Sequence, residues 1–127
     1  MQDKQLFEYA VIRVVPRVER EEFINVGVIL FSNRKKYLAC KLHFDAAKIQ
    51  TLSIEADLEE IEKNLESFSK IADGTKDSGP IGQLIPAERF RWLTATRSTV
   101  VQCSKVHPGF CLDPAQSLDR LFKELVL

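Results

Sequence analysis

The chain has 127 residues, 45% of them apolar and 28% charged, and its 18 basic and 18 acidic side chains give a formal net charge of zero. This length suits one domain spanning residues 1–127, and the apolar content excludes a disordered chain. The charge balance argues against a nucleic-acid-binding protein, because counterion release requires a concentrated basic face.

The first ten residues and the cysteine count indicate a cytoplasmic protein. The amino terminus shows no basic flank followed by an apolar stretch, so no secretory signal is expected. The longest apolar run, residues 26–31, is far too short to span a bilayer. An odd number of cysteines, three, fits free thiols in a reducing compartment better than a disulfide scaffold.

The first third of the chain predicts three strands, over residues 7–16, 25–32 and 37–44. The first two are rich in β-branched and aromatic residues at both parities, which is typical of strands buried on both faces. The third alternates, which suits a strand near the edge of the sheet. Short connections favour an antiparallel meander. Gly27, inside the second strand, marks a bulge or a close approach to the backbone.

The middle of the chain predicts an amphipathic helix whose apolar residues recur in steps of four and three. Asp57 and Glu60 resemble a capping box at its start, and Gly74 is a stop signal. Residues 73–80, DGTKDSGP, predict a mobile loop. The apolar stripe comprises Ile54, Leu58, Ile61, Leu65, Phe68 and Ile71.

The last third predicts two more helices and a fourth strand. A short helix begins with proline over residues 86–94, and a closing helix begins at Asp113 and Pro114. Between them, residues 98–106 predict a strand that ends in a turn at residues 107–109. The fold class is therefore α+β, a small antiparallel sheet of three to four strands, meander first, with amphipathic helices packed on it.

Four segments, in this order, resemble the bacterial family named domain of unknown function 3037. They are YAVIRVVPRVEREEFINVGVILF, ERFRWLTATRSTVVQ, VHPGFC and DPAQSLDRLFKELV. The resemblance implies a short, cytosolic, single-domain protein of the kind often encoded beside HipA-like kinases, and it supplies no reaction. The residues that match the family pattern are Arg13, Glu22, Asn25, Gly27, Arg91, Arg97, His107 and Gly109.

Arg13 lies in the middle of an apolar strand, where an unpaired charge is costly. One interpretation is an internal ion pair with a carboxylate such as Glu8 or Glu22. The other is an anion site in which Arg13 and Arg97 hold phosphate or carboxylate, with the Asn25 amide and Glu22 beside them.

The cysteines and histidines favour structural roles over chemistry. Cys40 and His43 are three apart in a strand, so their side chains point to opposite faces. His107 and Cys111, across the expected turn, could meet as a thiol and its base, but no third group orients them. The sequence therefore predicts no catalytic residue, no metal site and no cofactor.

Two functions remain open from the sequence. The first is a non-catalytic accessory module that binds another protein, a HipA-like kinase by resemblance, or a second copy of itself. The second is a small enzyme or ligand-binding protein with an anion site on Arg13, Asn25, Arg97 and Glu22. A flat exposed apolar surface would favour the first, and a polar pocket lined by those four side chains would favour the second.

Overall fold

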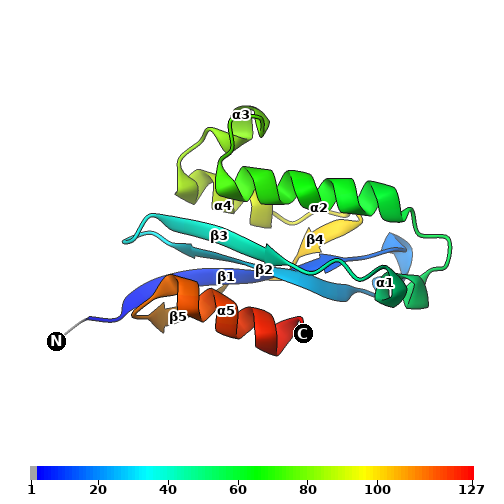
Figure 1. The fold of residues 1–127 in the computed structure, drawn as a ribbon, viewed down its shortest axis with the longest axis horizontal. Helices are drawn as coiled ribbons and strands as arrows, with labels where there is room; N and C mark the ends of the chain where they lie inside the picture. Colours follow the sequence, from blue (N-terminus) through cyan, green and yellow to red (C-terminus); the bar gives the residue numbers. More distant parts are fainter. Residues whose placement is uncertain (1–2) are drawn as a thin grey trace.

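The computed structural model describes residues 3–127, which form five strands and five α-helices, so the α+β prediction is confirmed (Figure 1). A 3-10 turn, Val18–Arg20, follows the first strand. In chain order the elements are β1 (Gln5–Val14), β2 (Ile24–Ser32), β3 (Tyr37–Leu42), α1 (Ala46–Leu52), α2 (Leu58–Asp73), α3 (Gly79–Gly82), α4 (Pro86–Thr94), β4 (Val101–Cys103), β5 (His107–Cys111) and α5 (Pro114–Leu125).

The strands form one antiparallel sheet. Strands β1, β2 and β3 follow one another as the predicted meander, and β3 lies at the edge. The other edge of β1 carries two strands, because β4 pairs with its second half and β5 with its first half. The sheet therefore has five strands rather than the three or four expected.

The predicted fourth strand is broken at Ser104. Here the Ser104 N–H donates to the Val11 carbonyl over 2.8 Å, while the Val11 N–H donates to the Ser104 Oγ, also over 2.8 Å. The side-chain oxygen thus takes the place that a backbone carbonyl would hold in a continuous ladder. The turn expected at residues 107–109 is wrong, because His107–Cys111 is extended and pairs with β1.

Helices cover both faces of the sheet (Figure 1). On one face, the side chains of Ile12 and Val14 pack with those of α2 and α4. On the other face, Phe7 and Leu30 pack with α5. The prediction that the first two strands are buried on both faces is confirmed, and the chain has three layers with the sheet in the middle.

A bulge at Gly27 fits both expectations for that glycine. The pairing of β1 with β2 shifts by one residue here, since Ile12 faces Gly27 while Arg13 faces Asn25. A Cβ at position 27 would lie 2.5 Å from the Lys41 carbonyl oxygen of β3. The bulge shifts the alternation of side chains along β2 by one residue. As a result, the Asn25 side chain lies on the face that α5 covers.

The helix ends follow their sequence signals. The Asp57 side chain accepts from the Glu60 N–H, and Gly74 ends α2 with a φ of 67°. Helix α4 begins at Pro86 as expected, and the Asp113 side chain caps α5.

Helices α1 and α3 were not predicted. Helix α1 begins at an Asp45 cap and has Ile49 as its one buried residue, so it offers too short an apolar pattern to detect. Helix α3 lies partly within residues 73–80, whose mobility stays a prediction. Within residues 3–127, every helix falls short of the length and apolarity that a bilayer-crossing segment needs.

Candidate functional site

Arg13 lies on the α5 side of β1, opposite Ile12 and Val14. Its guanidinium carbon sits 3.9 Å from the centre of the Phe23 ring, a cation–π contact. No carboxylate within residues 3–127 comes within 4 Å of it, and its buried Nε has no hydrogen-bond partner there. The structure thus gives Arg13 an aromatic neighbour in place of the internal ion pair considered from the sequence.

Both carboxylates considered as partners for Arg13 bind other arginines. Glu8 pairs with Arg91 of α4 over 3.1 and 3.2 Å. Glu22 pairs with Arg20 over 2.6 Å, and this hydrogen bond lowers the pKa of Glu22. The Glu8–Arg91 pair joins α4 to β1.

Asn25 is the direct neighbour of Arg13 across the strands. Its Nδ2 donates to the carbonyl oxygen of Leu125, at the end of α5, over 3.1 Å. Its buried Oδ1 has no partner within the described part of the chain. Arg13 and Asn25 therefore bring two unpartnered buried polar atoms to one place beside the end of α5.

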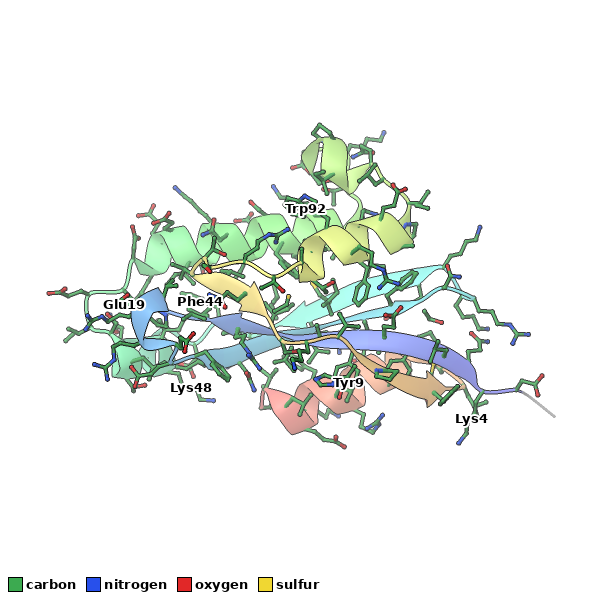
Figure 2. All side chains as sticks on the ribbon, turned by 180° about the vertical axis from the view of Figure 1, so that it is seen from behind. Lys4, Tyr9, Glu19, Phe44, Lys48 and Trp92 are labelled. Carbon is green, nitrogen blue, oxygen red and sulfur yellow. The ribbon has the colours of Figure 1, made fainter. Side chains whose placement is uncertain are left out.

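Arg97 lies elsewhere, beyond α4, where its guanidinium stacks 4.2 Å from the centre of the Trp92 ring and donates to the Trp92 carbonyl oxygen. Figure 2 labels Trp92 on α4 and Tyr9 among the side chains toward α5. Of the four residues expected in one anion site, the structure brings together Arg13 and Asn25 and places Arg97 across the sheet from them.

The three thiols lack the setting of a nucleophile. Burial raises the pKa of Cys40 and of Cys103 to about 12, and it also raises the pKa of Cys111. His107 and Cys111 do not meet across a turn, since they stand four positions apart along an extended strand, roughly 13 Å from one another. Residues 3–127 contain no group of three metal-ligating side chains.

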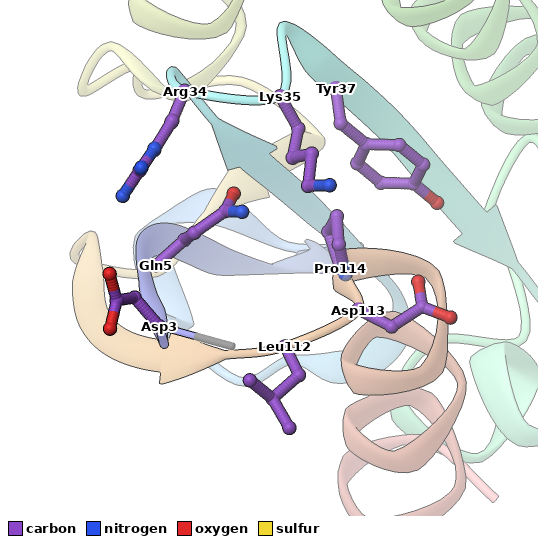
Figure 3. A pocket seen from close by; sticks show the side chains of 8 residues that line it. All are labelled: Asp3, Gln5, Arg34, Lys35, Tyr37, Leu112, Asp113 and Pro114. Atoms are coloured by element: carbon purple, nitrogen blue, oxygen red, sulfur yellow. The ribbon is translucent and has the colours of Figure 1, made fainter. Parts of the chain in front are cut away.

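A polar hollow of about 650 Å³ opens at the end of the sheet, below the β2–β3 turn (Figure 3). Arg34 and Lys35 reach it from that turn, and the carboxylates of Asp3 and Asp113 line its other side. Tyr37 borders it, with a phenol pKa raised by burial and by nearby acidic groups. Two positive and two negative side chains balance one another, so this hollow does not favour an ion of either sign.

An uncovered apolar feature lies at the opposite edge of the sheet from β3. Leu6 of β1 and Phe110 of β5 are direct cross-strand partners, and they are 52% and 68% exposed. The Glu8–Arg91 pair connects this edge to α4, and Leu84, which precedes α4 and lies near Arg91, is 38% exposed. We name this region, defined by Leu6, Phe110, Pro108, Arg91 and Leu84, the β5–α4 surface.

The β5–α4 surface does not follow from the sequence prediction, which has a turn at residues 107–109 where β5 lies. Once β5 is paired with β1, Leu6 and Phe110 fall on one face, and no helix within residues 3–127 covers that part of it. The signal that could have found it is the alternation of Val106, Pro108 and Phe110 through the segment taken as a turn.

A family model described as "Protein of unknown function (DUF3037)" matches residues 9–126. The chain belongs to the DUF3037 family. The match confirms the resemblance drawn from the four sequence segments, and it covers β1 through the end of α5. No curated protein and no solved structure matches this DUF3037 chain. The family description names no activity, so the function is argued from the geometry.

Proposed function

We propose that the chain is a non-catalytic accessory module that binds another protein through the β5–α4 surface. The observation that supports this is the pair Leu6 and Phe110, two large apolar side chains that lie side by side and are more than half exposed. Apolar side chains grouped in this way mark protein-binding surfaces, whereas isolated ones are ordinary.

The composition of the surface also fits a protein partner. Arg91 binds Glu8, the cross-strand partner of Pro108, and so borders the apolar side chains, and Arg is one of the residue types most enriched among energetically important contacts. The partner that the family resemblance implies is a HipA-like kinase in the bacterial cytoplasm. A second copy of the chain is the other partner that we consider.

The experiment is co-expression with a HipA-like kinase, followed by calorimetric titration of the purified proteins. We expect Phe110→Ala and Leu6→Ala each to weaken the complex by about tenfold or more, the usual effect at a central apolar contact. Ile54→Ala is the matched control, because Ile54 is 83% exposed but lies between α1 and α2.

Two outcomes would contradict this proposal. One is a chain that stays monomeric and binds no kinase at micromolar concentration. The other is a complex that tolerates Phe110→Ala and Leu6→Ala as well as it tolerates Ile54→Ala, which would place the interface elsewhere.

The second candidate is an anion site at Arg13 beside Asn25, favoured by the unpartnered buried Nε donor of Arg13. A guanidinium next to an amide can bind phosphate or carboxylate through charge-assisted hydrogen bonds. The test is titration with inorganic phosphate while the amide signals of β1 and β2 are followed by NMR. Saturable shifts that Arg13→Met abolishes would support the site, and unchanged signals would exclude it.

A further inference from the structure

A second hollow, of about 250 Å³, lies between α2, α4 and β4 and takes no part in either proposed function. Its walls are mainly apolar, from Phe68 and Ile71 of α2 and from Trp92 and Leu93 of α4. Such a concave site with few polar groups is the usual form of a small-molecule site.

Arg97 is the only charged side chain that lines this hollow within residues 3–127. Its guanidinium lies 4.2 Å from the centre of the Trp92 ring, and one of its nitrogens donates to the Trp92 carbonyl oxygen. Among the described residues, no Asp or Glu oxygen lies within 4 Å of it. Arg97 is thus held in place by neutral groups and keeps its remaining N–H donors.

The polar groups beside Arg97 are uncharged. Ser67 and Thr99 bring hydroxyl groups to the rim, and Asn64 brings an amide. A single positive charge in an apolar hollow complements a single negative charge on an apolar molecule. A phosphate dianion would require further cations, which the lining does not supply.

We propose that this hollow binds a small organic carboxylate with a flat apolar body. The carboxylate would pair with the free edge of the Arg97 guanidinium, whose planar fork matches it. The body would lie between Phe68 and Trp92. A volume of about 250 Å³ equals roughly eight water molecules, enough for one aromatic ring with a short acidic side chain.

Trp92 provides a direct readout, because it is the only tryptophan in the chain. The experiment titrates the chain with 3-phenylpropionate and, separately, with 3-phenylpropionamide, which has the same body and no charge. Tryptophan fluorescence and the amide signal of Thr99 in NMR are followed together. We expect saturable binding of the acid, with a dissociation constant about tenfold or more below that of the amide.

Variants separate the role of Arg97 from general effects. Arg97→Met should weaken binding of the acid by about tenfold to a hundredfold and leave the amide unaffected within about twofold. Arg97→Lys keeps the positive charge but lacks the planar guanidinium. It should weaken binding of the acid less than Arg97→Met does. Arg120→Met is the control, because Arg120 lies on α5 across the sheet and pairs with Glu124.

The comparison of acid and amide in the unmodified chain decides the proposal even where a variant fails to fold. Equal affinity for the two probes, or the absence of saturable binding of the acid, would overturn it. So would binding of the acid that Arg97→Met leaves intact.

Discussion

Arg13 lies one residue from Ile12 and from Val14, both fully enclosed in the core, yet its guanidinium turns the other way and covers Phe23. The Phe23 ring, which is itself 43% exposed, shields one side of the Arg13 guanidinium. Because Arg13 is only partly buried, its charge stays accessible to water. A charged side chain in an apolar strand therefore does not require a carboxylate partner when an aromatic ring covers one side of it and water can reach it.

The variant Arg13→Met should keep the fold. It removes a cation–π contact of about 0.5–2 kcal/mol, and it also removes an unpartnered buried nitrogen. We expect the free energy of unfolding to change by less than about 2 kcal/mol in urea titration. A loss of about 3–5 kcal/mol, as when a buried ion pair is broken, would show that Arg13 has a charged partner after all.

The raised thiol pKa values of Cys40 and Cys103 make the free energy of unfolding depend on pH in the alkaline range. Below pH 9 the thiols of Cys40 and Cys103 are protonated in both states. Between their ordinary value of 9.0 and about 12, the unfolded chain releases these protons while the folded chain keeps them. The free energy of unfolding therefore falls as the pH rises through this range.

We expect each thiol to remove about 1 kcal/mol between pH 8 and pH 10. Urea unfolding at pH 8 and pH 10 measures this loss, and the double variant Cys40→Ala, Cys103→Ala should lose correspondingly less. Equal losses in the two proteins would mean that the buried thiols ionise as readily in the folded state as in the unfolded one.

At the scale of elements, the break between β4 and β5 depends on one hydroxyl. Ser104 is 9% exposed, and its Oγ accepts from the Val11 N–H and donates to the Lys105 carbonyl oxygen. It thus supports the point at which two short strands share one edge of β1.

Ser104→Ala should destabilise the chain by about 1–3 kcal/mol, because the buried Val11 N–H loses its acceptor. Thermal unfolding measures the effect, and Ser98→Ala, at an exposed position, is the matched control. If the two variants unfold at the same temperature, water takes the place of the Ser104 hydroxyl. The break between β4 and β5 would then not depend on this hydroxyl.

The end of α2 is held by another side chain from outside the helix. Arg89 of α4 donates to the carbonyl oxygens of Ile71 and Ala72 over 3.0 and 2.7 Å, and to that of Leu84 over 2.9 Å. One guanidinium thereby joins the last turn of α2 to the segment that enters α4.

Arg89→Met should cost about 1–2 kcal/mol, since carbonyl groups at a helix end can bind water instead. Hydrogen exchange should accelerate at the amides of the last turn of α2 and through residues 73–80. Arg120→Met, an exposed arginine with an i,i+4 partner, should change stability by less than about 0.5 kcal/mol. Unchanged exchange at residues 73–80 in Arg89→Met would show that other contacts hold this segment.

At the scale of the whole molecule, local patterns predicted most elements and did not predict how distant ones meet. The meander, the bulge at Gly27 and the caps at Asp57 and Asp113 depend on near neighbours in the chain, so the sequence contains their signals. The division of the last strand depends on Val11, 93 residues away from Ser104, which no local pattern reveals.

The candidate sites show the same limit. The sequence identified Arg13 as an arginine in need of a partner and grouped Arg97 with it in one anion site, and the structure gives each an aromatic ring. It could not show that they lie on opposite sides of the sheet, because that depends on how α4 packs. The β5–α4 surface combines segments from both ends of the chain, and the hollow beside Arg97 combines α2 with residues 92–101.

The divided strand has a consequence for how copies of the chain behave when crowded. A fibre grows by adding strands to an open edge, and the outer edge of β4 and β5 is interrupted between residues 103 and 107. Pro108 removes one further donor from it. The chain can therefore display Phe110 to a partner without offering an unbroken template on which its own copies would stack.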